Sequence, residues 1–307
     1  IKLVKDFSES EKKLREIISN SKSFTFEGEA FVPELVTKPT IEGGGGETKT
    51  DVYIKARKIS DNSISEIKIS YKQKNFSFLE NKIKKERAEA IYGKNWLQVV
   101  SQQIEQIKER FAQQPLVYFE KSGNTRKGSI KLGWRYEMES FGKRTLGVPI
   151  KQNIAKQVLQ NKNAIKKYAD GIVNGKIIPG SGMPDYFLTE NISQIKNTDD
   201  IFQNLVSAKD MINKSKITAA FLAQNYDPFM DKQHGGNRRH LAVYVDWTAK
   251  NNKLSANLVF DKPLLIDSNQ QYDKLLIALE KLGISVGKRF NLSKLEEKIS
   301  PNVITSP

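Results

Sequence analysis

The chain has 307 residues, of which 50 are Lys or Arg and 35 are Asp or Glu, and its formal net charge is +15. Such an excess of cations is typical of proteins that bind polyanions, and nucleic acid is the expected partner. With 28% charged and 38% hydrophobic residues, the composition is that of a globular chain and excludes a disordered basic tail.

Missing residue types exclude several further classes of site. The sequence contains no Cys, which rules out disulfides, thiolate zinc sites and a cysteine nucleophile. The only histidines, His234 and His240, lack the acid-x-x-His spacing of a zinc site. No apolar run approaches the roughly 18 residues of a membrane helix, and no export signal is visible, so we expect a cytoplasmic protein without a membrane partner.

The N-terminal part shows a helix, a strand and a glycine run in that order. Ser8 and Glu11 form a capping box at the start of an amphipathic helix, and residues 23–31 alternate like a single strand. Gly43–Gly46 follow. Because no Lys-Ser/Thr pair comes after the glycines and a strand does, this is not a P-loop, and no nucleotide cofactor is predicted. The run either lets the backbone approach DNA closely or serves as a flexible spacer.

Residues 50–54 and 69–73 are predicted to be the arms of a β-hairpin, joined through the turn cluster Ser60-Asp61-Asn62-Ser63. If the turn is centred near residues 61–62, antiparallel pairing places Asp51 opposite Lys72. A carboxylate and a lysine distant in sequence would then lie side by side at the open end of the hairpin.

Two acid-x-Lys-like triplets on the second arm compete for this site, Glu66-x-Lys68 and Ser70-x-Lys72. All four side chains point to one face of the strand. Glu66 is the better metal ligand by chemistry, but the expected register places it deep in the hairpin and away from Asp51. Geometry therefore favours Ser70 and Lys72.

Over residues 47–78 the chain resembles the PD-(D/E)xK nuclease superfamily, and type II restriction endonucleases in particular. In that family an Asp begins one strand and an acid-x-Lys triplet ends the next. Asp51 matches the first position and Lys72 the lysine, whereas Ser70 stands in place of the second acid and Thr50 in place of the proline. The resemblance implies an αββαβ core with a mixed sheet, and a missing acid that Glu47, Glu29 or a helical residue such as Glu16 supplies.

The resemblance also implies Mg²⁺ as cofactor. Magnesium accepts one or two carboxylates and takes phosphate oxygens as further ligands, so Asp51 is the expected ligand, with the backbone carbonyl of Tyr71 and with Glu47 as an additional acid. Lys72 would orient or deprotonate the attacking water, or neutralise the charge that develops on the phosphate. The alternative is that Asp51 and Lys72 form a plain cross-strand ion pair.

Downstream of the hairpin, helical spacing extends from a basic stretch at residues 82–87 through Trp96 to Phe111, and residues 116–119 form a short strand. We expect this helix to pack on the hairpin's sheet and the strand to complete the αββαβ order. An alternating strand at 130–136 follows. Pro184-Asp185 looks like the family motif, but no acid-x-Lys strand follows it at a suitable distance.

Near the C-terminus, residues 241–247 and 253–260 are predicted to form a second hairpin, and a helix over 270–282 follows an Asp267-Ser268 cap. The loop before this hairpin is rich in side chains that bond base edges or phosphates. The predicted DNA contacts are Lys74, Lys82, Arg126, Lys127, Gln233, His234, Asn237, Arg238, Arg239 and His240.

These observations predict a nuclease core in residues 1–125 and a DNA-recognition and dimerisation region in residues 126–307, with one continuous domain as the alternative. The predicted function is sequence-specific, Mg²⁺-dependent cleavage of double-stranded DNA by a homodimer, as in a type II restriction enzyme. Two alternatives stay open. One is a less specific nuclease of the same superfamily in phage DNA processing or repair, and the other is a basic DNA-binding protein without catalysis.

Overall fold

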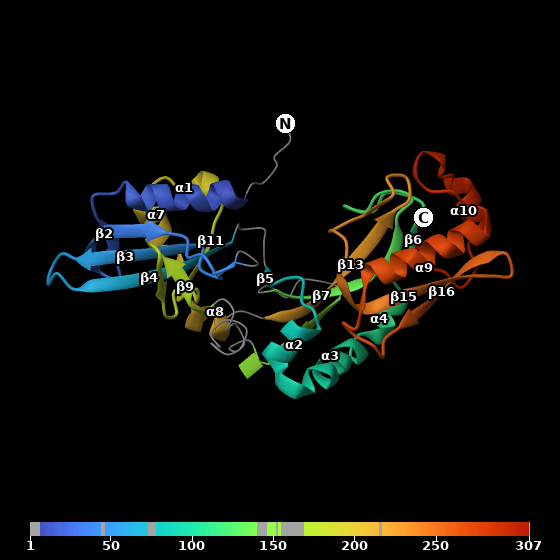
Figure 1. Cartoon of the computed structure of the whole chain (residues 1–307), viewed down its shortest axis with the longest axis horizontal. Helices are drawn as coiled ribbons and strands as arrows, with labels where there is room; N and C mark the ends of the chain where they lie inside the picture. The colour runs from blue at the N-terminus through green and yellow to red at the C-terminus, as the bar shows by residue number, and fades with distance from the viewer. Residues whose placement is uncertain are drawn as a thin grey trace. The chain divides into compact units, whose positions relative to one another are not determined.

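The computed structural model describes residues 7–43, 47–72, 78–139, 146–151, 153–154, 169–214 and 217–306. The chain divides into two compact units (Figure 1). The first unit is built from residues 1–77 and 151–215, and the second from residues 78–150 and 216–307. The predicted boundary between residues 125 and 126 lies inside the second unit, because the chain leaves the first unit after residue 77 and comes back at residue 151.

The first unit is organised around a six-stranded mixed sheet in the order β1-β2-β3-β4-β11-β12. Its strands are β1 (Phe24–Phe26), β2 (Glu29–Thr37), β3 (Val52–Lys58), β4 (Ile64–Lys72), β11 (Tyr186–Thr189) and β12 (Leu205–Ser207). All neighbours are antiparallel except β4 and β11, which run parallel. The single strand expected over residues 23–31 is instead the β1–β2 hairpin, since Glu27 and Gly28 adopt left-handed φ angles of 50° and 80° and reverse the chain.

Helix α1 (Phe7–Ser19) lies along one face of this sheet, as Figure 1 shows, and confirms that a helix forms here. It begins at Phe7, so Ser8 lies inside the helix and is not its cap, and the Glu11 side chain accepts from Lys38. Its Leu14 and Ile18 are one turn apart, so both point into the core, where they join Val52, Ile54 and Ile69. The remaining elements of the first unit are short: the β9 (Gly171–Val173) and β10 (Lys176–Ile178) hairpin, η2 (Ile192–Gln194), α7 (Thr198–Phe202) and α8 (Ala208–Lys214).

The second unit is built on a sheet of ten strands whose central strand is β7 (Ile130–Glu139). The main path runs β14-β13-β7-β15-β16, through β14 (Lys232–Gln233), β13 (Thr218–Asp227), β15 (His240–Lys250) and β16 (Lys253–Val259). The other strands are β5 (Phe78–Glu80), β6 (Val117–Tyr118), β8 (Gly147–Pro149), β17 (Ile266–Asp267) and β18 (Thr305–Ser306). Nearly every residue of β7 is buried, because this sheet is covered on both faces.

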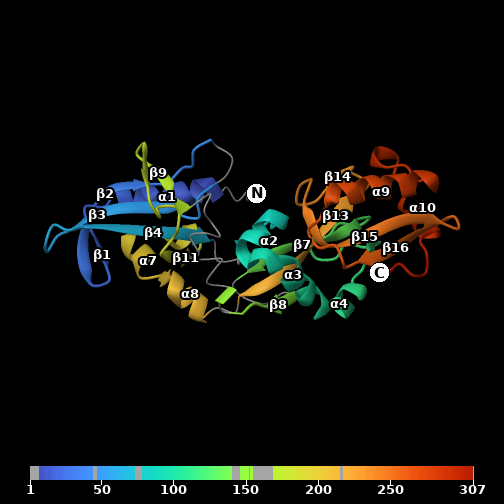
Figure 2. The same ribbon diagram turned by 60° about the horizontal axis from the view of Figure 1, so that its bottom comes forward.

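Helix α9 (Ser268–Lys281) covers one face of the ten-stranded sheet, and the helices between β5 and β6 cover the other (Figure 2). These are α2 (Lys85–Tyr92), η1 (Gly93–Asn95), α3 (Trp96–Glu105) and α4 (Lys108–Ala112); the C-terminal part adds η3 (Gly287–Arg289) and α10 (Leu292–Lys298). The expected continuous helix is thus broken by Gly93 (φ 72°) and again at Ile107. It packs through Phe111 on Trp134 and Phe221 of the second unit, not on the hairpin's sheet.

The predicted C-terminal hairpin and helix are confirmed, whereas the strand predicted over residues 116–119 pairs with different strands from those expected. The β15–β16 hairpin and α9, which has an Asp267–Gln270 capping box, form where expected. The strand over residues 116–119 exists as β6, but it pairs with β7 and β18 in the second unit. The parallel neighbour of β4 is β11 instead. The overall class is α+β with a sheet of mixed orientation, as predicted, and none of the described helices is long and apolar enough to cross a membrane.

Candidate active site

The open end of the β3–β4 hairpin brings the predicted catalytic residues together, in a register two residues away from the expected one. Val52 pairs with Ile69, and the Asp51 amide donates to the Ile69 carbonyl at 2.9 Å. Asp51 therefore lies opposite Ser70, with Lys72 two residues further along the same face.

The turn explains the shift in register. Lys58 and Ser63 close the hairpin with a hydrogen bond from the Lys58 amide to the Ser63 carbonyl at 2.8 Å, which leaves residues 59–62 as the loop. Asn62 has a left-handed φ of 60°, and the Asp61 carboxylate accepts from the Ser63 amide. The loop centre thus moves by one residue, and the strand pairing moves by two.

The Asp51 carboxylate is held in place from β4. Its Oδ2 accepts a hydrogen bond from the Tyr71 amide at 2.8 Å and another from the Ser70 hydroxyl at 3.2 Å. The Asp51 carbonyl accepts from the Arg15 guanidinium of α1 at 3.0 Å. Asp51 is only 6% exposed and Ser70 2%. A carboxylate with two donors on one oxygen is oriented, and its other oxygen is left for a different partner.

Burial governs the protonation of Asp51. Desolvation raises the pKa of this carboxyl to about 6, with a further upward contribution from Glu11, while Lys72, Lys38 and the Tyr71 amide act in the opposite direction. Lys72 is the strongest of the groups that lower the pKa, which means that its ammonium is close enough to act on the carboxylate. A buried acid with a raised pKa beside a lysine is a combination found at functional sites.

A second acid reaches this site from α1. The Lys38 ammonium lies 2.7 Å from Glu11 Oε2, 3.8 Å from Asp51 Oδ1 and 3.8 Å from Glu47 Oε2. Burial works to lower the pKa of Lys38, but the Glu11 hydrogen bond and the three carboxylates together raise it. The ammonium therefore stays charged and holds Glu11 and Asp51 on two sides of one cation.

Glu11 was not among the residues predicted to replace the missing acid. Glu16 is exposed and pairs with Lys12, and Glu29 pairs with Lys58 at the turn end of the hairpin. A sequence signal for Glu11 does exist: it precedes Leu14 by three residues, so it lies on the helix face that enters the core. Glu47 is near Lys38, but its side chain is 80% exposed.

The competing triplet is engaged elsewhere. Lys68 forms an ion pair with Asp185 at 3.1 Å and also donates to the Gly180 carbonyl. Glu66 hydrogen-bonds Tyr53. Because β11 runs parallel to β4, the Pro184-Asp185 pair that precedes β11 lies beside Lys68. Lys68 thus has a carboxylate partner of its own, distinct from Asp51.

The donor set at Asp51 suits a hard cation. Among the described residues no group of three or more His, Cys, Asp and Glu side chains is arranged to hold a metal ion. Asp51 and Glu11 provide two carboxylates, which is the number that Mg²⁺ uses when waters and substrate phosphates complete its shell. Ser70 adds an oxygen beside Asp51, and the sequence contains no Cys, so these residues fit Mg²⁺ and do not fit zinc.

Apart from Lys74, the predicted DNA contacts outside the hairpin are spread over the second unit. Lys74 lies outside the described residues. Lys82 is exposed with a φ of 57°, ahead of α2 and not within a helix. Arg126 is 60% exposed and lies 3.5 Å from Asp227, and Lys127 pairs with Glu120. All three cations described here remain accessible to a phosphate.

In the segment at residues 233–240, several side chains predicted to contact DNA instead form hydrogen bonds within the protein. Gln233 is 4% exposed, and its amide donates to Asn269 Oδ1 at 3.0 Å. Arg239 donates to the Gly235 carbonyl, and a ring nitrogen of His240 lies 3.1 Å from the Leu264 carbonyl. These side chains hold the loop in shape. His234 is 39% exposed and lies 3.5 Å from Asp227, and Asn237 and Arg238 are also exposed.

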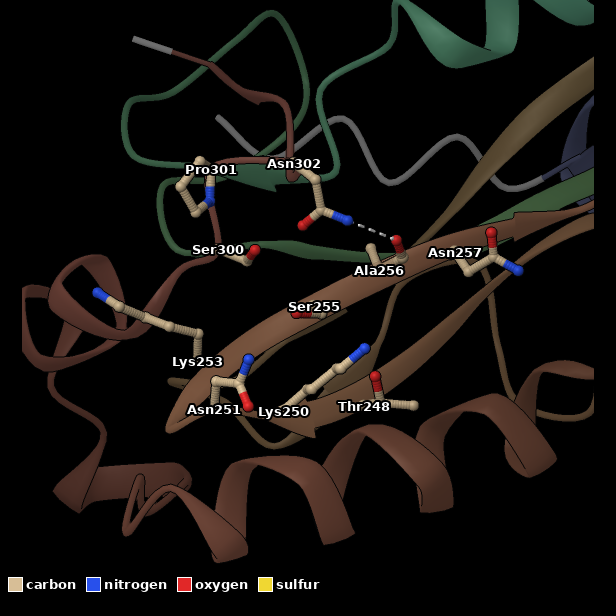
Figure 3. A pocket seen from close by; sticks show the side chains of 10 residues that line it. All are labelled: Thr248, Lys250, Asn251, Lys253, Ser255, Ala256, Asn257, Ser300, Pro301 and Asn302. Atoms are coloured by element: carbon tan, nitrogen blue, oxygen red, sulfur yellow. Dashed lines mark hydrogen bonds between the residues drawn. The ribbon is translucent and has the colours of Figure 1, made fainter.

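A polar cleft of about 540 Å³ lies at the tip of the β15–β16 hairpin (Figure 3). Residues 300–302 face the hairpin across it, and the Asn302 amide donates to the Ala256 carbonyl. Lys250 and Lys253 are the charged residues of its described lining, which contains amides and hydroxyls but no carboxylate. With its lysines, amides and hydroxyls, this cleft is suited to polar or anionic groups.

Comparison of the chain with family models, with curated proteins and with solved structures finds no match. The features that bear on function are therefore the chemistry and geometry of the hairpin site and the distribution of charge.

Proposed function

We propose that this chain is a Mg²⁺-dependent endonuclease of double-stranded DNA whose active site is formed by Asp51, Ser70, Lys72 and Glu11. The observation that carries the proposal is the buried Asp51 carboxylate, which is oriented from β4 and whose pKa is lowered by Lys72 and raised by Glu11. Phosphodiester hydrolysis needs an acid that holds a divalent ion and a cation that neutralises charge on the phosphate.

The topology of the first unit supports the same proposal. An N-terminal helix is followed by three antiparallel strands, β2, β3 and β4, and a later strand, β11, pairs parallel to β4. This order is similar to that of the PD-(D/E)xK core, in which the first acid begins one strand and the lysine ends the next. Asp51 and Lys72 occupy those two positions, immediately before β3 and at the end of β4.

In the proposed mechanism, Asp51, Glu11 and the Tyr71 carbonyl would hold Mg²⁺. The ion would supply Lewis-acid chemistry, polarising the scissile phosphate and activating a water for attack. Ser70 keeps the Asp51 oxygen in a fixed position. Lys72 approaches the phosphate, where its ammonium neutralises the charge that builds up on the equatorial oxygens or orients the attacking water. Lys38 keeps the two acids paired with a positive charge before the ion binds.

The DNA partner is supported by the distribution of charge. The second unit contains 27 Lys and Arg residues against 17 Asp and Glu, so it carries most of the net positive charge of the chain. A polyanion binds such a surface with counterion release, and its affinity falls steeply as salt is raised. We propose further that cleavage is sequence-specific, as in a type II restriction enzyme, and that a homodimer cuts the two strands.

Plasmid cleavage tests this proposal. Purified protein is incubated with unmethylated plasmid and phage DNA, in Mg²⁺ and in EDTA, alongside Asp51→Ala, Lys72→Ala and Lys68→Ala. Lys68→Ala is the matched control, because it removes a lysine from the same strand and face whose partner is Asp185. We expect discrete Mg²⁺-dependent bands that both site variants lose by orders of magnitude in rate, with DNA affinity retained, and that Lys68→Ala keeps.

The other outcomes assign the chain differently. A smear of fragments would support a less specific nuclease. Bands that survive Lys72→Ala but vanish in Lys68→Ala would move the site to Glu66, Lys68 and Asp185. Salt-sensitive binding without cleavage of several DNAs would leave a DNA-binding protein in which Asp51 and Lys72 form a plain ion pair.

A further inference from the structure

The turn between β13 and β14 exposes two large apolar side chains side by side. Phe229 is 43% exposed and Met230 is 61% exposed, at the tip of the hairpin formed by the Tyr226–Gln233 and Asp227–Lys232 pairs. Isolated exposed apolar residues are common and need no explanation. Two adjacent ones at a hairpin tip form a small apolar projection.

This tip is held rigidly. Asp227 Oδ1 accepts hydrogen bonds from the Phe229 amide at 3.0 Å and the Met230 amide at 3.3 Å. The following Asp231 accepts from the hydroxyls of Tyr226 at 2.7 Å and Tyr272 at 2.9 Å, which ties the turn to helix α9. A turn restrained on both sides keeps its backbone in one conformation, so little backbone entropy is lost on binding.

The Phe229 ring is fixed as well. It packs edge-to-face on Phe290, with ring centroids 4.7 Å apart. Its other neighbour is Gly128, where a Cβ atom would lie 2.5 Å from the ring, so only glycine leaves room for the phenyl group. The Gly287 amide donates to the Pro228 carbonyl at 2.7 Å, which joins η3 to the same turn.

Exposed cations lie on each of the three segments that meet at this apolar tip, the 126–128 turn, the hairpin and η3: Arg126, Lys127, Lys232, Lys288 and Arg289. Arg126 and Lys127 have carboxylate partners, whereas the structure gives Lys232, Lys288 and Arg289 no ion pair among the described residues. A rigid apolar centre with a rim of free cations is complementary to duplex DNA, whose stacked bases lie between two rows of phosphates.

We propose that Phe229 and Met230 form a wedge that enters a base step of duplex DNA while the surrounding cations bind the flanking phosphates. The inference rests on the DNA partner proposed above, but it does not depend on the hairpin active site. A wedge of this kind unstacks the step that it enters, and it untwists and bends the duplex there.

DNA unwinding tests the wedge without knowledge of a target sequence. Asp51→Ala protein, which keeps the plasmid intact, is bound to circular DNA in EDTA. A topoisomerase that needs no Mg²⁺ relaxes the complex, and the linking number is measured after the protein is removed. We expect a linking-number change that grows with bound protein, that Met230→Ala reduces and that Phe229→Ala combined with Met230→Ala abolishes at equal DNA occupancy. Met230→Ala removes a mostly exposed side chain, so its fold is preserved.

Ile277→Ala is the matched control, because Ile277 is 53% exposed on α9 and is not part of the tip. It should unwind DNA as the parent does. Binding without unwinding by the parent protein, equal unwinding by the double variant, or absence of DNA binding would each overturn the wedge. Cleavage by protein with Asp51 intact is scored separately: unwinding without cleavage keeps the wedge and removes the nuclease, and cleavage without unwinding does the reverse.

Discussion

Replacing Asp51 by Asn should stabilise the first unit at neutral pH while it abolishes cleavage. The Asp51 carboxyl has a folded pKa of about 6 against an ordinary value of 3.8, mainly because it is buried. A carboxyl with a raised pKa binds its proton more tightly in the folded state than in the unfolded state. The stability that the proton contributes is present below pH 3.8 and is lost as the pH rises through 6.

The magnitude follows from the two pKa values. At pH 7.5 the ionised carboxylate costs about 3 kcal/mol relative to a neutral side chain of the same shape, and at pH 4.5 the cost falls to about 1 kcal/mol. Asn keeps an oxygen that accepts from the Ser70 hydroxyl and the Tyr71 amide, so the hydrogen bonds that orient the side chain survive. Asp51→Asn should therefore exceed the parent in stability by amounts of that order.

The assay is urea unfolding in EDTA at several pH values. Trp96, Trp134 and Trp247 all lie in the second unit, so tryptophan fluorescence follows that unit while circular dichroism follows both. If the two units unfold separately, the tryptophan-detected transition is an internal control that Asp51→Asn leaves in place. Adding Mg²⁺ should stabilise the parent protein and not the variant, because a ligand stabilises only the state that binds it.

Asp61→Asn is the control, because it should change the stability in the opposite direction. The Ser63 hydrogen bonds lower the pKa of Asp61, so its contribution to stability is present above its unfolded pKa and is lost as the pH falls. Its variant should be less stable than the parent at neutral pH. An Asp51→Asn protein that is no more stable than the parent at pH 7.5, or whose advantage does not shrink toward pH 4.5, would refute the assignment of Asp51 as a buried, destabilised carboxylate.

Three further outcomes are expected. Glu11→Gln should weaken Mg²⁺ binding and lower the pKa of Asp51, because the Glu11 charge raises that pKa. Thermal-shift titrations with Mg²⁺ compare this variant with Glu16→Gln, which changes an exposed acid of the same helix. Equal Mg²⁺ affinities of the two variants would contradict the prediction. Apparent Mg²⁺ affinity should fall about tenfold for each pH unit below 6, since only the ionised carboxylate binds, and a flat profile between pH 5 and 7 would exclude Asp51 as the ligand. Gly133→Ala should destabilise the second unit by about 2–4 kcal/mol in tryptophan-detected unfolding. Gly133 has a φ of 155°, and a Cβ there would overlap the Val243 carbonyl and lie 2.9 Å from Tyr244 Cα. An unchanged unfolding midpoint would contradict this close strand packing.

The parts of the candidate active site that the sequence predicts are those that depend on local patterns. The alternation of Val52 and Ile54, and of Ile67 and Ile69, fixes the hairpin and its buried face because side-chain direction has a period of two in a strand. The register depends on the geometry of the 59–62 loop, which involves a left-handed Asn62 that composition alone does not specify. Asp51, Ser70 and Lys72 still meet after the two-residue shift, because all three lie on one face.

The features that sequence misses are the tertiary ones. Strand β11 follows β4 by more than a hundred residues, since the chain builds part of the second unit in between, and no local pattern indicates that pairing. The sequence therefore favours the nearer β6 as the strand that completes the core, although β6 pairs with β7 and β18. Glu11 likewise reaches Asp51 only through the packing of α1 on the sheet, and Gln233 lies among polar residues that suggest a surface loop although it is buried against Asn269.

The identity of Ser70 can be explained by combining its local strand position with the tertiary packing around it. The site directly opposite Asp51 is 2% exposed, and a second carboxylate there would place two like charges in adjacent buried positions. Ser70 instead donates to Asp51 and favours its ionised form. The second acid comes from α1, where the Glu11 side chain is 15% exposed and bonded to Lys38, so its charge is compensated before any metal binds. The serine in place of the second acid and the presence of Glu11 are thus parts of one electrostatic arrangement. The candidate site keeps two acids, but only Asp51 is deeply buried, and the group opposite it, Ser70, is polar and neutral.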